Sequence, residues 1–235
     1  MLIYQRKGVK AMKKVLFFII IVLSWLTYNK ISTKADLAED ASLASTLQKI
    51  PLVQERHTYP PTSYPPSVEA PYLPIQTKLP NVYSFTFKGQ KVTLLAEFDI
   101  EAKVLSREDY SYDEASALSP VDFALGWRRM SDEKVIESLD ITQSRRWYRW
   151  SVDKLPIPRR EIERSSANMH MVPATHKVEA ILDDVDEGDI VHIRGYLMRA
   201  DTAEGRYWVS SLTRDDTGGG ACEIIFVQDI RINGH

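Results

Sequence analysis

Residues 82–106 read VYSFTFKGQKVTLLAEFDIEAKVLS. Polar and apolar side chains alternate before the KGQ of residues 88–90, and apolar side chains recur from Val92 to Val104 after it. Such alternation predicts β-strands, and a glycine between two such runs is typical of a hairpin turn. The sequence therefore predicts a β-hairpin at the beginning of a folded domain.

The C-terminal third predicts further strands. An acidic turn at residues 187–189 precedes a strand that starts at Ile190 and is interrupted at Gly195, and a last strand covers residues 222–232. This order of turn, strand and strand glycine resembles the first part of an OB-type barrel over roughly 60 residues. The resemblance implies a small closed barrel. We therefore expect an α+β fold, a β-rich, OB-like small barrel with short helices.

Two short helices and one more strand are expected between these regions. Residues 119–122 read SPVD, in which a capping residue is followed by proline and an acid, and they predict a helix that ends at Gly126. A second helix is expected from Ser131, with Val135 facing inward. Residues 141–150 predict a single strand.

The N-terminal region predicts a membrane anchor. Residues 15–28 read VLFFIIIVLSWLTY and follow five basic residues with no acidic one. As a helix they reach about 21 Å, short of a ~30 Å hydrocarbon core, but lysines at both ends can snorkel. The charge bias predicts a single-pass inner-membrane helix with residues 1–14 in the cytoplasm and the C-terminal domain outside, in the periplasm. The alternative is a signal sequence cleaved near Ala35.

Residues 29–80 predict a spacer between this anchor and an extracytoplasmic β-rich domain at residues 81–235. Seven of the twelve prolines lie between residues 57 and 80. Proline-rich segments favour extended polyproline II structure, which makes a semi-rigid stalk. A docking motif for an aromatic-lined groove is the alternative interpretation.

Composition excludes several classes of protein. The 235 residues are 44% apolar, enough for a globular core. After residue 14 the chain carries 25 basic and 32 acidic residues, a formal charge of −7, which argues against non-specific nucleic-acid binding. The single cysteine excludes an internal disulfide, a cysteine-rich zinc module and an iron–sulfur cluster.

Several short phrases of the domain carry a family resemblance. They are VLSR (104–107), SPVD (119–122) with LGW (125–127), QS (143–144) with RWY (146–148), SANMH (166–170) and SLTR (211–214). Together they resemble a family of uncharacterised, membrane-anchored bacterial envelope proteins over about residues 81–232. The resemblance implies an envelope location and one compact domain, and it implies no particular activity.

Cys222 and His170 are the first candidates for chemistry. A thiolate and an imidazole can form a nucleophilic pair, and the glycines of residues 218–220 offer backbone N–H groups to an oxyanion. An anchored Cys–His enzyme is similar to a sortase, but the sortase cysteine ends a Thr-Leu-x-Thr-Cys strand, whereas here SLT is followed by Arg214. Glu223 beside the thiol favours an unreactive cysteine, because a neighbouring carboxylate raises a thiol pKa. A thiol transferase or hydrolase is therefore the alternative.

Histidines suggest a metal site only as an alternative. His170 and His176 are six residues apart, a spacing that fits neither one face of a helix nor one face of a strand. His192 is further along the chain. No standard ligand spacing is present, so we expect no metal and no cofactor.

Residues 145–150 read RRWYRW and are the third candidate site. On one strand Arg145, Trp147 and Arg149 share a face, and Arg146 lies on the other face with the remaining aromatic residues. Cations between aromatics can bind polyanions or nucleic acid. The simpler interpretation is a strand whose aromatics pack inward while its arginines pair with the acidic body.

The sequence thus predicts a membrane-tethered extracytoplasmic binding or assembly module of the bacterial envelope, and it favours a non-enzyme over an enzyme. The expected partners are the inner membrane and an envelope protein or glycan. Nucleic acid is not an expected partner.

Overall fold

The computed structural model describes residues 43–54, 64–213 and 222–233. The chain divides into two compact units, Met1–Ile50 and Pro51–His235. In the first unit, residues 43–47 are helical. The predicted anchor at residues 15–28 lies outside the described residues. Within the part that is described, no helix is both long and apolar enough to cross a membrane.

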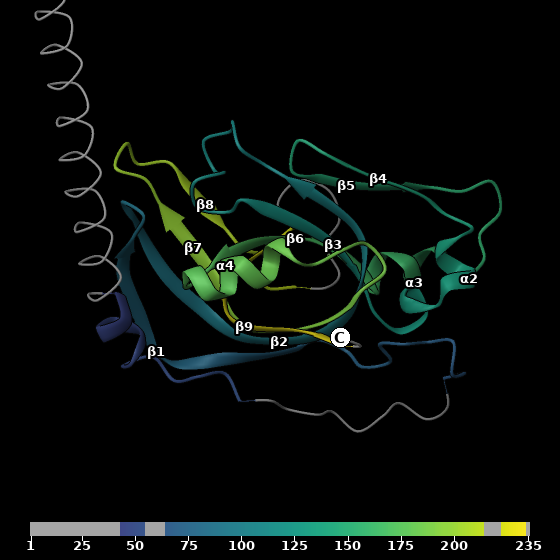
Figure 1. The fold of residues 1–235 in the computed structure, drawn as a ribbon, viewed down its shortest axis with the longest axis horizontal. Helices are drawn as coiled ribbons and strands as arrows, with labels where there is room; N and C mark the ends of the chain where they lie inside the picture. The colour runs from purple at the N-terminus through teal and green to yellow at the C-terminus, as the bar shows by residue number, and fades with distance from the viewer. Residues whose placement is uncertain (1–42, 55–63, 214–221, 234–235) are drawn as a thin grey trace, which may run out of the picture. The chain divides into compact units, whose positions relative to one another are not determined.

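The second unit is built on a mixed, seven-stranded sheet (Figure 1). Its strands are β1 (Ile75–Phe87), β2 (Gln90–Asp109), β3 (Val121–Gly126), β6 (Ser166–Pro173), β7 (Ile190–Asp201), β8 (Tyr207–Val209) and β9 (Glu223–Asn233). Their order across the sheet is β1-β2-β3-β6-β9-β7-β8, with an additional pairing of β2 with β7. Only β6 and β9 pair in parallel among these described strands.

The additional pairing makes the sheet partly ring-like. β2 pairs with β7 from Lys91 to Lys103 and with β3 from Lys103 to Asp109, so its two partners use different halves of its length. The long strand β2 therefore pairs with both β3 and β7, and only Lys103 pairs with both of them. The sheet is not a barrel, and the expected OB-like barrel was wrong in this respect. The β-rich architecture with short helices is confirmed.

The predicted hairpin at residues 82–106 is confirmed as β1 and β2. The turn between them contains Lys88 and Gly89, with φ angles of 46° and 74°. Both angles lie in the left-handed region that two-residue hairpin turns require, and glycine enters it without steric cost.

Residues 121–126 form strand β3 and not the predicted helix. Every residue of this strand is buried. A run of VDFALG that is apolar on both sides suits a central strand, and β3 pairs with β2 on one edge and β6 on the other. The cap-like Ser119-Pro120 was misleading, because burial of the following residues on both faces outweighs a local helix signal.

Residues 141–150 form two strands in place of the predicted one. β4 (Asp140–Ser144) and β5 (Trp147–Ser151) make a separate two-stranded antiparallel sheet. The two residues between them, Arg145 and Arg146, have φ angles of 52° and 67°. Turns of this kind are usually marked by asparagine or glycine, so a pair of arginines gives no signal from which the turn can be predicted.

A smaller core fixes this hairpin to the domain. Beside β4 and β5 in Figure 1 lie α2 (Glu133–Ile136) and α3 (Arg159–Arg164), which follow the short helix η1 (Arg128–Ser131) and β5 respectively. The buried side chains of this core are Leu105, Ala124, Met130, Val135, Leu139, Ile157 and Ile162, and those packed against it include Ile141, Tyr148 and Trp150. The helix expected from Ser131 is present but starts at Glu133, because Asp132 is its cap and accepts from the Lys134 N–H at 3.1 Å.

The main core lies between the sheet and α4 (His176–Asp183). It includes Phe98, Ile100, Phe123, Leu125, Met169, Met171, Ile193, Leu197, Ile225 and Val227, and α4 adds Val178 and Leu182. Gly195 allows β7 and β9 to approach closely, because a Cβ there would lie 2.1 Å from the Phe226 carbonyl oxygen. Gly195, which interrupts the predicted strand, is therefore required by the close packing of β7 against β9.

Part of the region expected to be a spacer contacts this domain. The Arg128 N–H donates to the Ala70 carbonyl at 2.7 Å, and the Ala70 N–H donates to Ser131 Oγ at 2.9 Å. Glu69 forms an ion pair with the buried Lys103 at 2.6 Å. Residues 68–70 are therefore held to the end of the sheet near η1.

Candidate functional site

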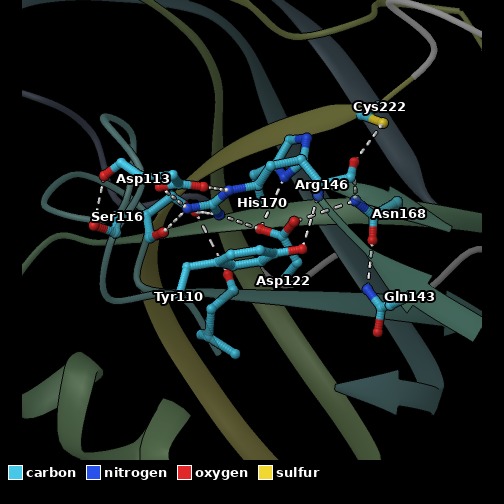
Figure 2. Close-up of polar contacts among 11 residues, drawn as sticks. Tyr110, Asp113, Ser116, Asp122, Gln143, Arg146, Asn168, His170 and Cys222 are labelled. Carbon is cyan, nitrogen blue, oxygen red and sulfur yellow. Dashed lines mark hydrogen bonds and ion pairs between the residues drawn. The ribbon is translucent and has the colours of Figure 1, made fainter. Parts of the chain in front are cut away.

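The Arg146 side chain turns inward from the β4–β5 turn and is held by two carboxylates. Its guanidinium makes two hydrogen bonds to Asp113, at 2.7 and 2.9 Å, and one to Asp122 Oδ1 at 2.7 Å. Nη2 also donates to the Ser119 carbonyl oxygen at 2.9 Å. Figure 2 draws the contacts of Asp113 and Asp122 with the guanidinium as dashed lines. We call Tyr110, Asp113, Ser119, Asp122, Arg146, Asn168 and His170 the Arg146 cluster.

Asp122 is the buried centre of this cluster. Its side chain is fully buried on β3, and Oδ1 lies 2.7 Å from Arg146 Nη1 and 2.8 Å from His170 Nδ1. The His170 contact is short, but its direction is not that of a hydrogen bond. Asn168 Nδ2 donates to the other oxygen, Oδ2, at 3.4 Å. A buried carboxylate is tolerated only when it is paired, so Arg146 and Asp122 depend on each other.

Tyr110 provides the aromatic wall of the cluster. The Arg146 guanidinium carbon lies 3.6 Å from the centre of the Tyr110 ring, a close cation–π stack. The Tyr110 hydroxyl accepts from the Arg146 backbone N–H at 2.8 Å. Burial raises the pKa of Tyr110, more than the Arg146 contact lowers it. The ring therefore stays neutral while it holds both the side chain and the backbone of Arg146.

The charges in the cluster stabilise one another. Burial disfavours the charged form of Arg146, but hydrogen bonds to Asp113 and the charge of Asp122 outweigh it, so that the Arg146 pKa is raised. The hydrogen bonds from Arg146 in turn lower the pKa of Asp113. The guanidinium is therefore charged at every ordinary pH and is engaged with the domain itself.

Amide and hydroxyl groups join the rest of the hairpin's inner face to β6. Asn168 Nδ2 donates to the Arg146 carbonyl oxygen at 3.1 Å, and Gln143 Nε2 donates to Asn168 Oδ1 at 2.6 Å. The Tyr148 hydroxyl donates to Ser166 Oγ at 3.2 Å. Burial raises the pKa of Tyr148 to about 12, with the Ser166 hydrogen bond acting in the opposite direction. Both strands of the hairpin are thus tied to β6.

Cys222 and His170 are near the same cluster but do not form a hydrogen-bonded pair. The half-buried Cys222 thiol lies 4.0 Å from the Arg146 carbonyl oxygen, to which Figure 2 shows its contact. His170 is 2% exposed and contacts Asp122 and the Trp208 ring, whose centre is 4.5 Å from its own. Within the described residues, the thiol is not among the contacts of His170. The described contacts therefore differ for the two candidates: the thiol contacts the Arg146 carbonyl, and His170 contacts Asp122 and Trp208.

The three histidines considered for metal binding lie in three different places. His176 is exposed at the start of α4, where its Nδ1 is 3.2 Å from Glu179. His192 on β7 pairs with the buried Asp99 on β2 at 2.6 Å. No group of three or more histidine, cysteine or acidic side chains suited to a metal occurs in the described segments. The structure therefore does not bring His170 and His176 together.

The outer face of the hairpin carries the other three residues of the predicted binding site. Arg145, Trp147 and Arg149 are all exposed, with 40% of the Trp147 surface accessible. The Arg149 guanidinium lies 5.8 Å from the Trp147 ring centre. The structure therefore separates the predicted set: the Arg146 side chain is held inside the domain, Trp147 and Arg149 share the exposed face of β5, and Arg145 is exposed in the turn before it.

Comparison of the chain with protein families, curated proteins and solved structures finds no match.

Sequence reasoning missed Tyr110, Asp113 and Asp122, although one signal was present. Alternation places Arg146 on the same face as Tyr148 and Trp150, and an arginine on an apolar face needs a buried acid. Asp122 is the acid inside the apolar VDFALG run of β3. To pair Arg146 with Asp122 from the sequence, residues 121–126 must first be recognised as a strand.

Proposed function

We propose that this protein is a membrane-tethered, extracytoplasmic binding or assembly module of the bacterial envelope, without enzymatic activity. The tether is the apolar segment at residues 15–28, and the basic residues before it favour an orientation in which the domain is outside the cytoplasm. The resemblance of residues 81–232 to anchored envelope proteins supports the same location.

One observation carries the binding role. The Arg146 guanidinium makes its contacts with the domain itself and fixes a two-residue turn whose outer face remains open to solvent. Two consecutive arginines in the left-handed region each cost about 1–2 kcal/mol, and such strain persists only where the surroundings impose it. The buried groups therefore serve to hold a surface in place.

The proposal is tested in cells with the intact chain. A photo-crosslinking amino acid at Thr142, on the outer face of β4, is compared with one at Lys177, an exposed position on α4. We expect an adduct from Thr142 with an envelope component, in the membrane fraction, and little from Lys177.

Two outcomes would contradict the proposed function. One is equal labelling from Thr142 and Lys177, which would show no preferred surface. The other is a reporter fused after residue 235 that is active only in the cytoplasm, which would place the domain on the wrong side of the membrane.

A further inference from the structure

Thirteen arginines lie in the described residues, and they differ in their partners. Most of them lie beside a carboxylate: Arg107, Arg129, Arg146, Arg159, Arg194, Arg199, Arg206 and Arg231. Arg145 and Arg149 have no carboxylate partner in the described part of the chain; the contacts of Arg149 are to Ser144 Oγ at 3.4 Å and to the Trp147 ring. The domain carries more acidic than basic residues, yet within its described part these two exposed arginines lie beside no carboxylate.

The face between these arginines is suited to a flat, partly apolar ring. Trp147 and Arg149 are alternate residues of β5, about 6.8 Å apart, and the exposed Arg145 is in the turn that precedes β5. The residues opposite on β4 are hydroxylic, since Ser144 pairs with Trp147 and Thr142 with Arg149. An exposed indole beside hydroxyls and guanidinium groups can stack on a sugar ring, hydrogen-bond its hydroxyls and bind its carboxylates.

The inner face of the hairpin makes this arrangement rigid. Arg146 fixes the turn from which Arg145 projects, and Tyr148 and Gln143 tie the two strands to β6. A surface that is ordered before it binds loses less conformational entropy on binding.

We propose that the outer surface of the β4–β5 hairpin, formed by Arg145, Trp147, Arg149 and the Ser144 hydroxyl, binds an acidic glycan through its sugar rings and carboxylates. This proposal rests on the proposed binding role and names its ligand class. The charge of −7 beyond residue 14 opposes long polyanions that depend on charge alone, so a ligand with a sugar ring and spaced carboxylates fits better than nucleic acid.

The test uses the full-length protein in detergent and measures binding to polygalacturonate. The probes for comparison are fully methyl-esterified polygalacturonate, which lacks the charge, and double-stranded DNA, which lacks the carboxylated sugar chain. We expect the acidic polysaccharide to bind and both comparison probes to bind at least about tenfold more weakly.

Matched variants separate this surface from general electrostatics. R145Q/R149Q and R159Q/R206Q each remove two positive charges. Arg159 and Arg206 are 67% and 60% exposed, but each lies beside a carboxylate. We expect R145Q/R149Q to lose about tenfold or more in affinity and to show weaker salt dependence, W147A to lose about tenfold, and R159Q/R206Q to stay within about twofold. All three should melt close to the parent, which excludes unfolding as the cause.

The outcomes are distinguishable from those of the crosslinking test. No binding of polygalacturonate by the parent protein, an equal loss in both double variants, or DNA binding as tight as that of the polysaccharide would overturn the glycan proposal. A Thr142 adduct with an envelope protein would then still support the binding role. If no adduct forms at Thr142, both the proposed binding role and the acidic glycan as its ligand are contradicted.

Discussion

Arg146 Nη1 on the β4–β5 turn lies 2.7 Å from Oδ1 of Asp122 on β3, and the Asp122 side chain is fully buried. The two residues come from separate sheets, so this contact joins the hairpin to the domain. It also fixes the turn that carries the neighbouring Arg145. Arg145 and Trp147, on either side of Arg146, are exposed to solvent.

The first prediction concerns the arginines of the turn. R146Q leaves Asp122 buried without its guanidinium, and loss of one partner of a buried pair costs about 3–5 kcal/mol. R145Q, which changes an exposed side chain, should alter the free energy of unfolding by less than about 0.5 kcal/mol. Urea unfolding at pH 7 measures both. Equal effects of the two substitutions would show that Arg146 is not specially held.

The fold was predictable where signals were local. The turn at Lys88 and Gly89 is a local signal, and the strands on either side of it were predicted correctly. Residues 121–126 were not, because their strand depends on partners supplied by β2 and β6. The closure of the sheet through β2 and β7 also depends on long-range pairing, which residue patterns do not reveal.

The second prediction concerns acid. The folded-state pKa of Asp113 is lowered by hydrogen bonds from Arg146, so Asp113 stabilises the fold above its unfolded pKa near 3.8, and this contribution is lost as the pH falls through the lowered value. D113N should therefore flatten the loss of stability between about pH 5 and pH 2, by less than about 1 kcal/mol because the carboxylate is partly exposed.

The control for D113N is E137Q, which changes an exposed carboxylate with no ion pair in the described structure. Urea unfolding at pH 7 and at about pH 3 compares the two variants with the parent. An acid dependence that is the same in D113N and the parent would contradict the assigned role of the Arg146 contact.

The third prediction concerns alkali. Burial raises the folded pKa of Tyr148 to about 12, whereas the unfolded side chain ionises near 10.0. Between these values the unfolded chain loses a proton that the folded chain keeps, so stability falls as the pH rises. Y148F should reduce this fall, although burial of Tyr196 leaves part of it in place.

Y148F also removes the hydrogen bond to Ser166, so its stability at pH 7 should be lower by about 1 kcal/mol. The exposed Tyr207 provides the control, since Y207F should leave the alkaline dependence unchanged. Unfolding measured at pH 8 and at about pH 11 gives the comparison. A fall as steep in Y148F as in the parent would show that Tyr148 is not buried.

The fourth prediction separates the two tryptophans of β5. Trp150 packs against the smaller core, with the Arg159 guanidinium carbon 4.9 Å from its ring centre, whereas Trp147 is 40% exposed. W150A should destabilise the domain by about 2–4 kcal/mol and W147A by less than about 1 kcal/mol. Thermal melting would contradict this assignment of faces if W147A were the less stable variant.

The candidate site was predictable in part. Alternation correctly predicts that Trp147 and Arg149 share a face of β5 opposite to Tyr148 and Trp150, whereas Arg145 and Arg146 lie in a turn that it did not predict. The partner of Arg146 could not be predicted, because Asp122 is distant in the sequence and was placed on a helix. Cys222 and His170 were considered as an alternative catalytic pair on residue type alone, and the structure gives them different contacts, Cys222 with the Arg146 carbonyl and His170 with Asp122 and Trp208.

The most direct test of the account is a double-mutant cycle between R146Q and D122N, measured by urea unfolding at pH 7. If the Arg146–Asp122 contact holds the hairpin, the loss in the double variant should be smaller than the sum of the two single losses by about 1.5 kcal/mol or more. Losses that add to within about 0.5 kcal/mol would contradict the account, because the two residues would then stabilise the fold independently.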